Sequence, residues 1–216
     1  MSEFLSKKSL KLLTDPLNDN NPITVQVLGI CSALAVTVKV EPAIVMGLSV
    51  MVVTAMANFI VSSLRNTIPD RIRIIVQLVI VAALVIIVDQ VLKAFAYEVS
   101  KQLSVFVGLI ITNCIIMGRL EAFALANKPG ASFLDGIGNG LGYAIILIII
   151  AVIREILGAG TITLPGLGEI PIIPQAFYDF GYKNNGLVIL PPMALIVVGL
   201  IIWFQRAKNK GLIESK

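Results

Sequence analysis

Two stretches of the sequence are the most informative about the fold: residues 22–37 read PITVQVLGICSALAVT, and residues 103–121 read LSVFVGLIITNCIIMGRLE. Each is an apolar run interrupted by glycine and by hydroxyl or amide side chains, with one cysteine in its middle. These are the only two cysteines in 216 residues, and the chain contains no histidine. Apolar runs of this length predict membrane spans. Their polar, glycine-containing composition predicts that these two spans are irregular.

The composition excludes a soluble enzyme. Hydrophobic residues make up 57% of the chain and charged residues only 14%, where a soluble domain carries about 25% charged residues. The apolar runs are continuous and do not alternate with polar residues, which excludes a transmembrane β-barrel. The fold class is therefore an all-α polytopic membrane protein.

Six uncharged stretches predict six transmembrane helices. They are residues 20–38, 42–64, 74–88, 102–118, 136–153 and 184–205. The connection 157–185 is rich in glycine and proline and predicts a turn-rich external loop. Pro191 and Pro192 either begin the sixth helix or kink it.

The distribution of basic residues predicts the orientation. Twelve of the seventeen Lys and Arg residues fall in the termini and the connections on their side, and five fall in the other connections. Cytoplasmic segments carry the excess of Lys and Arg, so we expect both termini in the cytoplasm. Residues 1–19 form the N-terminal segment, 20–205 the membrane domain and 206–216 the C-terminal tail. The net charge of +4 follows from this rule, and no nucleic-acid partner is expected.

The sequence of the membrane domain predicts two repeats, at about residues 20–93 and 101–205. The first and fourth spans hold the cysteines, and the second helix of each half ends in an arginine, Arg65 or Arg154. Repeats of three helices enter the membrane from opposite sides, which is an inverted-topology architecture. We expect the first and fourth helices to be broken half-helices, the fourth ending between Cys114 and Gly118.

The cysteines are candidate metal ligands. At about 1.5 Å per helical residue, Cys31 and Cys114 both reach the middle of the membrane, about 14 to 15 Å deep. Thiolates suit iron–sulfur clusters, which normally need four cysteines, so two would come from a partner. Two other interpretations stay open: small buried apolar residues, or a disulfide if the Cα atoms come within about 7 Å.

Two acids lie next to the hydrocarbon region and are candidates for an ion pathway. Asp89 follows the third uncharged stretch and Asp135 precedes the fifth, where an unpaired charge costs about 2.5 kcal/mol or more. The alternatives are interfacial exposure or an ion pair with Lys93 for Asp89, and a position at the N-terminal end of the fifth helix for Asp135.

The cysteine stretches, together with residues 71–77, 88–93, 135–142 and 154–158, resemble one family over about residues 18–205. The family comprises the membrane subunits of the sodium-translocating NADH:quinone oxidoreductase and of the related ferredoxin:NAD oxidoreductase (Rnf) complex. The segments before and within the first span, and the end of the third, are most similar to the D-type members.

This resemblance implies an integral subunit of a bacterial inner-membrane complex that oxidises NADH, reduces ubiquinone and exports Na⁺. A homologous E-type subunit would pair with it in inverted orientation, and Cys31 and Cys114 would supply half the ligands of a shared [2Fe-2S] centre. Flavins, NADH and quinone would bind to the A-, B-, C- and F-type subunits. The chain lacks a Gly-x-Gly-x-x-Gly fingerprint, and we interpret its glycines at 136, 138, 140 and 142 as helix-packing positions.

Two other functions remain as alternatives. A secondary transporter would also suit an inverted repeat, with Asp89 and Asp135 as ion sites. A structural membrane subunit would have no chemistry of its own.

Overall fold

A computed structural model describes residues 7–17, 20–69, 71–95, 108–164, 168–171 and 186–208. Its elements are, in chain order, α1 (Lys7–Thr14), the 3₁₀ turn η1 (Asp15–Leu17), α2 (Ile30–Val36), α3 (Val40–Leu64), α4 (Arg73–Phe95), α6 (Cys114–Arg119), the π-helix η2 (Leu120–Ala124), α7 (Pro129–Gly158), β1 (Thr161–Leu164), β2 (Gly168–Pro171), the 3₁₀ turn η3 (Gly186–Ile189) and α9 (Pro191–Lys208). The fold is mostly helical, as predicted.

Three of the six predicted spans are continuous helices long and apolar enough to cross a membrane: α3, α4 and α7. The first predicted span contains only the seven-residue α2, and the fourth is interrupted at Asn113. The sixth corresponds to α9, of 18 residues. Since α9 begins at Pro191, the first of the two interpretations of the proline pair is confirmed.

The expectation of an all-α chain is wrong in one detail. β1 and β2 pair as an antiparallel hairpin, with Thr161 opposite Pro171 and Leu164 opposite Gly168. The hairpin lies inside the connection predicted as a turn-rich loop, whose residues 172–185 lie outside the described part of the chain. The short strands TITL and GEIP carry too few residues for a period-2 pattern to stand out.

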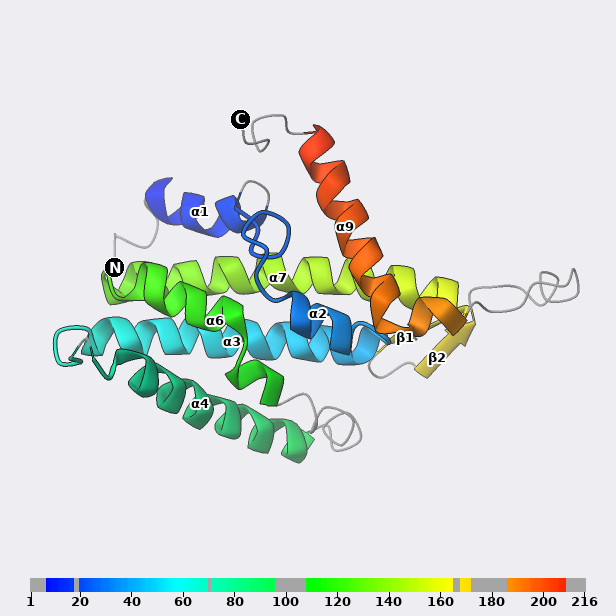
Figure 1. Ribbon diagram of the computed structural model, residues 1–216. Helices are drawn as coiled ribbons and strands as arrows, with labels where there is room; N and C mark the ends of the chain where they lie inside the picture. The colour runs from blue at the N-terminus through cyan, green and yellow to red at the C-terminus, as the bar shows by residue number, and fades with distance from the viewer. Residues whose placement is uncertain are drawn as a thin grey trace, which may run out of the picture.

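The helices α3 and α7 form the centre of the molecule (Figure 1). They pack antiparallel through small residues, since a methyl group on Gly47 would lie 2.8 Å from Ala144 Cβ, and one on Gly136 would lie 2.7 Å from Ala55 Cα. Gly140 likewise meets the backbone of α3. Small residues allow this close approach where lipid offers no hydrophobic driving force.

A second face of α7 receives the N-terminal segment. A methyl group on Gly138 would lie 2.6 Å from Leu12 O of α1, and one on Gly142 would lie 2.5 Å from Pro16 O of η1. Glycines at alternate positions thus serve two partners, α3 on one side and α1 with η1 on the other. The interpretation of these glycines as helix-packing positions is confirmed.

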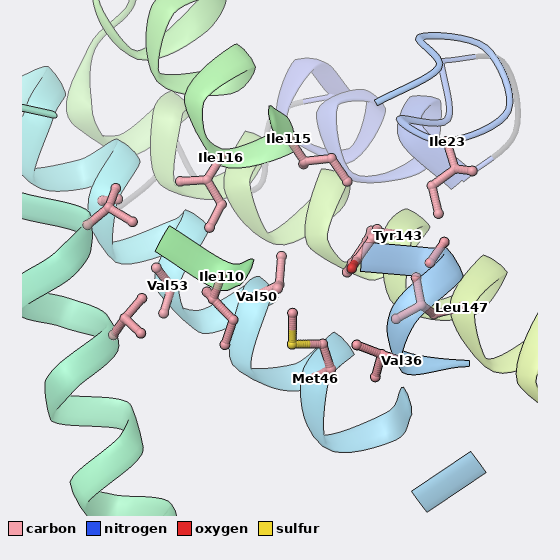
Figure 2. Close-up of a cluster of buried hydrophobic side chains, with 14 of the residues drawn as sticks. Ile23, Val36, Met46, Val50, Val53, Ile110, Ile115, Ile116, Tyr143 and Leu147 are labelled. Carbon is pink, nitrogen blue, oxygen red and sulfur yellow. The ribbon is translucent and has the colours of Figure 1, made fainter. Parts of the chain in front are cut away.

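Buried apolar side chains from α2, α3, α7 and the two interrupted spans fill the space between the elements (Figure 2). Among them are Ile23 and Val36 of the first span, Ile115 and Ile116 of the fourth, and Leu147 of α7, each at most 1% exposed. By contrast, α4 and α9 carry rows of exposed apolar residues. Those rows include Ile74, Ile75, Val79, Ile86, Ile87 and Val91 on α4, and Leu195, Ile196, Leu200, Trp203 and Phe204 on α9. Such surfaces suit lipid or other membrane subunits.

Candidate functional site

The first interrupted span turns before it becomes helical. Asn21 Oδ1 accepts hydrogen bonds from the backbone N–H groups of Ile23 (3.0 Å) and Thr24 (3.3 Å). Val27 and Gly29 both have positive φ angles, of 57° and 77°. Helix α2 then begins at Ile30, so that Cys31 lies in its first turn.

The second interrupted span breaks at Asn113, immediately before Cys114. The Asn113 side chain accepts a hydrogen bond from the Ile115 N–H (3.1 Å) and thereby caps the N-terminus of α6. A broken fourth helix is confirmed, but its predicted position is wrong: the chain stays helical through Gly118 and continues into the π-helix η2. The side-chain cap of Asn113 accompanies this break, because it satisfies a backbone N–H at the start of α6.

The two breaks meet in space. The backbone N–H of Gly29, two residues before Cys31, donates a hydrogen bond to Cys114 Sγ over 2.8 Å. Gly29 is required there on two counts, because its φ of 77° disfavours other residues and a Cβ would lie 2.5 Å from Ile115 Cδ1 and 3.2 Å from Tyr143 Cε2. Both cysteines therefore occupy first turns of short helices at one place in the fold.

A buried polar network links these breaks to α7. Tyr143 OH donates to Ser32 Oγ (2.7 Å), Asn113 Nδ2 donates to the same oxygen (3.4 Å), and Ser32 Oγ donates to Gly29 O (2.9 Å). Tyr143, Ser32 and Asn113 are each fully buried. Sequence patterns did not single out these residues. The available signal was adjacency, since Ser32 follows Cys31 and Asn113 precedes Cys114.

Both cysteines are free thiols, with Cys31 exposed and Cys114 half-buried, so no disulfide joins them. Within the described ranges no group of three or more His, Cys, Asp or Glu side chains could hold a metal ion. Two free thiols at adjoining helix breaks could supply half of the four-cysteine set that an iron–sulfur cluster normally needs. An exposed Cys31 leaves one side of the pair open to ligands from another chain.

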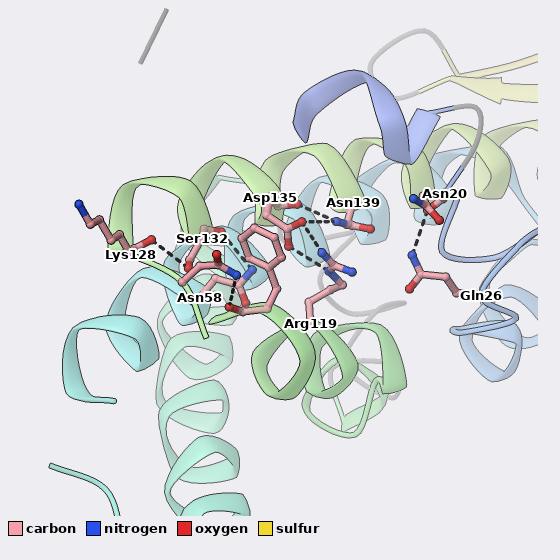
Figure 3. Close-up of polar contacts among 10 residues, drawn as sticks. Asn20, Gln26, Asn58, Arg119, Lys128, Ser132, Asp135 and Asn139 are labelled. Carbon is pink, nitrogen blue, oxygen red and sulfur yellow. Dashed lines mark hydrogen bonds and ion pairs between the residues drawn. The ribbon is translucent and has the colours of Figure 1, made fainter. Parts of the chain in front are cut away.

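Asp135 is buried and ion-paired (Figure 3). Arg119 Nε donates to Asp135 Oδ2 (2.9 Å) and Arg119 Nη2 pairs with Oδ1, while Asn139 Nδ2 also donates to Oδ1 (3.1 Å). Helix α7 begins at Pro129, six residues before Asp135. The interpretation of Asp135 as a residue of the helix N-terminus is therefore wrong: the helix starts a full turn and more earlier than the uncharged stretch.

Asp89 has a different, local partner. Lys93 Nζ lies 2.6 Å from Asp89 Oδ2, one helical turn further along α4. The expected ion pair is confirmed. The two candidate acids thus have separate partners. Asp89 pairs with Lys93 of its own helix, α4, whereas Asp135 of α7 pairs with Arg119 at the end of α6.

Two buried charged residues of α7, Arg154 and Glu155, have structural roles that the sequence did not indicate. The charge pattern places Arg154 with the external connections, but it lies inside α7 and is 1% exposed. It donates to Thr37 Oγ1 (2.6 Å), just beyond α2, and to the carbonyls of Val188 (3.2 Å) and Ile189 (2.6 Å) in η3. Arg154 therefore ties the half-helix of Cys31 to the segment before α9.

Glu155 caps the start of α3. Its carboxylate accepts hydrogen bonds from the backbone N–H groups of Val40 (2.6 Å) and Thr163 (2.7 Å) and from the Thr163 hydroxyl (2.8 Å). A carboxylate is favourable at the positive end of a helix. Glu155 thereby joins α7, the N-terminus of α3 and the β1–β2 hairpin.

Comparisons with known proteins agree in the family they indicate. The family model described as "Rnf-Nqr subunit, membrane protein" matches residues 9–202. The D subunit of the Na(+)-translocating NADH-quinone reductase of Psychromonas ingrahamii is 55% identical over 205 residues, which cover 95% of each chain. The corresponding D subunits of Pseudoalteromonas atlantica and Yersinia pestis (strain Pestoides F) are 54% and 53% identical over 211 residues, or 98% of this chain and 98% and 99% of theirs.

Proposed function

The chain belongs to the Rnf-Nqr family of membrane subunits, and from this premise we propose that it is the D subunit of a bacterial Na⁺-translocating NADH:quinone reductase. In this role it carries electrons through an iron–sulfur centre within the membrane and couples their passage to Na⁺ export. The observation that carries the proposal is the contact between the two helix breaks that hold the cysteines: the N–H of Gly29, two residues before Cys31, is bonded to Cys114 Sγ.

The donor set supports a shared centre. Cys31 and Cys114 would hold one half of a [2Fe-2S] group, and a homologous E-type subunit would supply the other two thiolates. When bound, this group accepts and releases single electrons. The residues of this chain orient the two sulfur atoms, while N–H···S hydrogen bonds such as that of Gly29 tune the potential of such centres.

The packing of α3 against α7 supports an inverted repeat. Gly47 and Gly136 lie 89 residues apart in the sequence, and so do Ala55 and Ala144. Gly47 meets Ala144, and Gly136 meets Ala55. Adding 89 to the residue numbers of α3 gives the corresponding positions of α7, so the contacts Gly47–Ala144 and Gly136–Ala55 join equivalent positions of the two helices. A two-fold axis between antiparallel repeats requires such paired contacts.

The arginines at the ends of the same helices repeat this relationship. Arg65 and Arg154 are also 89 residues apart. Arg154 Nη1 donates to Thr37 Oγ1 beyond α2, and Arg65 Nη1 donates to the carbonyl of Asn127 beyond η2. Each arginine thus contacts the segment that follows the cysteine-bearing half-helix of the other repeat. This reciprocity favours two inverted three-helix repeats, at about residues 20–93 and 101–205.

Asp135 is the acid we assign to the Na⁺ pathway, with Asp89 as a second position nearer the other side of the membrane. Asp135 is buried beside Asn139, whose Oδ1 has no hydrogen-bond partner among the described residues. Oxygen ligands of this kind suit a hard cation. Because Arg119 holds the carboxylate, binding of an ion there requires the Arg119–Asp135 pair to open.

Several further features belong to the proposal. The complex lies in the inner membrane with both termini of this chain in the cytoplasm, and its A-, B-, C- and F-type subunits bind NADH, flavins and ubiquinone. The corresponding subunit of the ferredoxin:NAD oxidoreductase complex is the second candidate, since the family model covers both kinds.

The test is turnover of the assembled complex with Cys31→Ser and Cys114→Ser. Each serine variant should abolish NADH-driven quinone reduction, while oxidation of NADH by an artificial acceptor should persist at the flavin-containing part. Thr54→Val is the matched control, because Thr54 Oγ1 donates to Val50 O of its own helix. Quinone reduction at the control rate in both cysteine variants would contradict the proposal and favour a transporter or a structural subunit.

A further inference from the structure

Ser32 is the central residue of the network between the two cysteine-bearing breaks. A serine hydroxyl offers one donor and two acceptor positions. Ser32 Oγ uses its donor on Gly29 O (2.9 Å) and accepts from Tyr143 OH (2.7 Å) and Asn113 Nδ2 (3.4 Å). Its hydrogen-bonding capacity is therefore filled, and each bond reaches a different segment of the chain.

Tyr143 anchors this network to the central helix pair. Its side chain is fully buried in the core cluster, at the middle of α7. Its ring also contacts the Gly29 turn, because a Cβ on Gly29 would lie 3.2 Å from Tyr143 Cε2. Figure 2 shows Tyr143 beside Leu147 of α7 with its oxygen turned toward the short α2.

Both ends of the network adjoin a thiol. Ser32 directly follows Cys31, and Asn113 directly precedes Cys114. Gly29, which accepts from Ser32 through its carbonyl, donates to Cys114 Sγ through its N–H. A displacement of Ser32 would therefore disturb the surroundings of both cysteines at once.

We propose that Tyr143 is a positioning residue, whose buried hydroxyl acts through Ser32 to hold the two cysteine-bearing half-helices in register before a partner supplies further ligands. The two half-helices have few residues of their own: seven in α2, and six in α6 before it continues into the five-residue η2. Helices this short are not stable in isolation, so their relative position depends on contacts such as this one.

The inference rests on the proposed function only where it assumes that the two thiols bind an iron–sulfur group. The position of the thiols themselves can be measured without iron. The experiment uses the assembled complex, stripped of iron, and follows alkylation of each cysteine of this chain by N-ethylmaleimide with mass spectrometry. Cys31 is exposed and Cys114 half-buried, so the rate at Cys114 is the sensitive readout.

Tyr143→Phe removes one oxygen and keeps the ring, and Ser32→Ala removes the shared partner. Tyr143→Phe should raise the alkylation rate of Cys114 about 2- to 10-fold, the change in opening equilibrium that corresponds to loss of one buried hydrogen bond. Ser32→Ala should raise it at least as much, because it removes all three bonds of the Ser32 hydroxyl. The double variant should not exceed Ser32→Ala by much, because Ser32→Ala already removes the bond between Tyr143 and Ser32. Thr54→Val, which removes a buried hydroxyl bonded within α3, should behave as the parent.

A second arm tests the loaded complex. With iron bound, Tyr143→Phe should shift the electron paramagnetic resonance spectrum and the midpoint potential of the centre, whereas Thr54→Val should leave both unchanged. If the parent holds no cysteine-dependent iron, the proposed function fails while the alkylation result still stands. Alkylation of Cys114 at the Thr54→Val rate in both Tyr143→Phe and Ser32→Ala would overturn the inference.

Discussion

Gly29 and Asn113 explain why an apolar chain places two cysteines at helix starts. Gly29 adopts a φ of 77° and allows the chain to turn into α2, while Asn113 caps α6 with its side chain. Neither role depends on lipid or on a partner. The unusual backbone at each site is bonded within protein, which is the condition for irregular structure at membrane depth.

Gly29→Ala tests the first of these roles. The left-handed conformation costs a non-glycine residue about 1 to 2 kcal/mol, and the new methyl group would press on Ile115 Cδ1. We expect a lower thermal transition of the complex and faster alkylation of Cys114. Gly199→Ala is the control, since a Cβ there meets nothing within 4 Å; equal transitions for the two variants would contradict the assignment.

The two ion pairs should differ in their effect on stability. Loss of one partner of a buried pair costs about 3 to 5 kcal/mol, so Asp135→Ala should strongly destabilise the chain. Asp89→Ala should cost no more than about 1 kcal/mol, because Lys93 is 46% exposed. Chemical denaturation of the two variants gives the comparison, and similar losses would show that Arg119 and Asp135 do not form a buried pair.

The alternating glycines of α7 divide its surface between α3 and α1. Gly136 and Gly140 face α3, and Gly138 and Gly142 face α1 and η1. The described part of the N-terminal segment, α1 and η1, therefore packs against α7 of the membrane domain. The sequence alone had predicted residues 1–19 to be a separate cytoplasmic segment. Period-2 glycines on a helix have no single face, which is why their two partners became evident only from the structure.

Gly138→Leu should release α1 and leave the α3–α7 contact intact. A side chain at this position would collide with Leu12 O, 2.6 Å from the first added carbon. We expect faster proteolysis after Lys11 in the folded complex, with no loss of the complex itself. Gly199→Leu should leave the cleavage rate at its parent value, and unchanged cleavage in Gly138→Leu would rule out this docking.

The sequence predicted the long helices well and the breaks less well. Continuous apolar runs located α3, α4 and α7, although α7 extends beyond its uncharged run to include Asp135 and Arg154. A hydropathy pattern places a helix boundary at each charged residue. Asp135 and Arg154 lie inside α7 nevertheless, because their charges are buried and have hydrogen-bond partners. Likewise, the sequence predicted that the fourth helix breaks near Gly118. The break lies five residues earlier, at Asn113, which caps α6. The hydrogen bonds of Ser32 reach Asn113 and Tyr143, which are far from it in the sequence. Local sequence patterns cannot predict such long-range contacts.

The whole molecule carries exposed apolar rows on α4 and α9 and buried polar side chains near the two breaks. If both termini are cytoplasmic, reporter fusions that fluoresce only in the cytoplasm should be active at residue 1 and residue 216. A fusion inserted in the 172–185 connection should be inactive. Activity at that connection would contradict its external position, and activity at only one terminus would contradict an even number of membrane crossings.

We propose above that Cys31 and Cys114 supply half of a shared iron–sulfur centre. Iron and acid-labile sulfide should therefore be measured on this chain purified alone and on the assembled complex, for the parent, Cys31→Ser and Cys114→Ser. We predict that iron and sulfide at the midmembrane site appear only in the complex and are lost equally in both variants. The same iron and sulfide content in parent and variants would show that Cys31 and Cys114 do not bind iron.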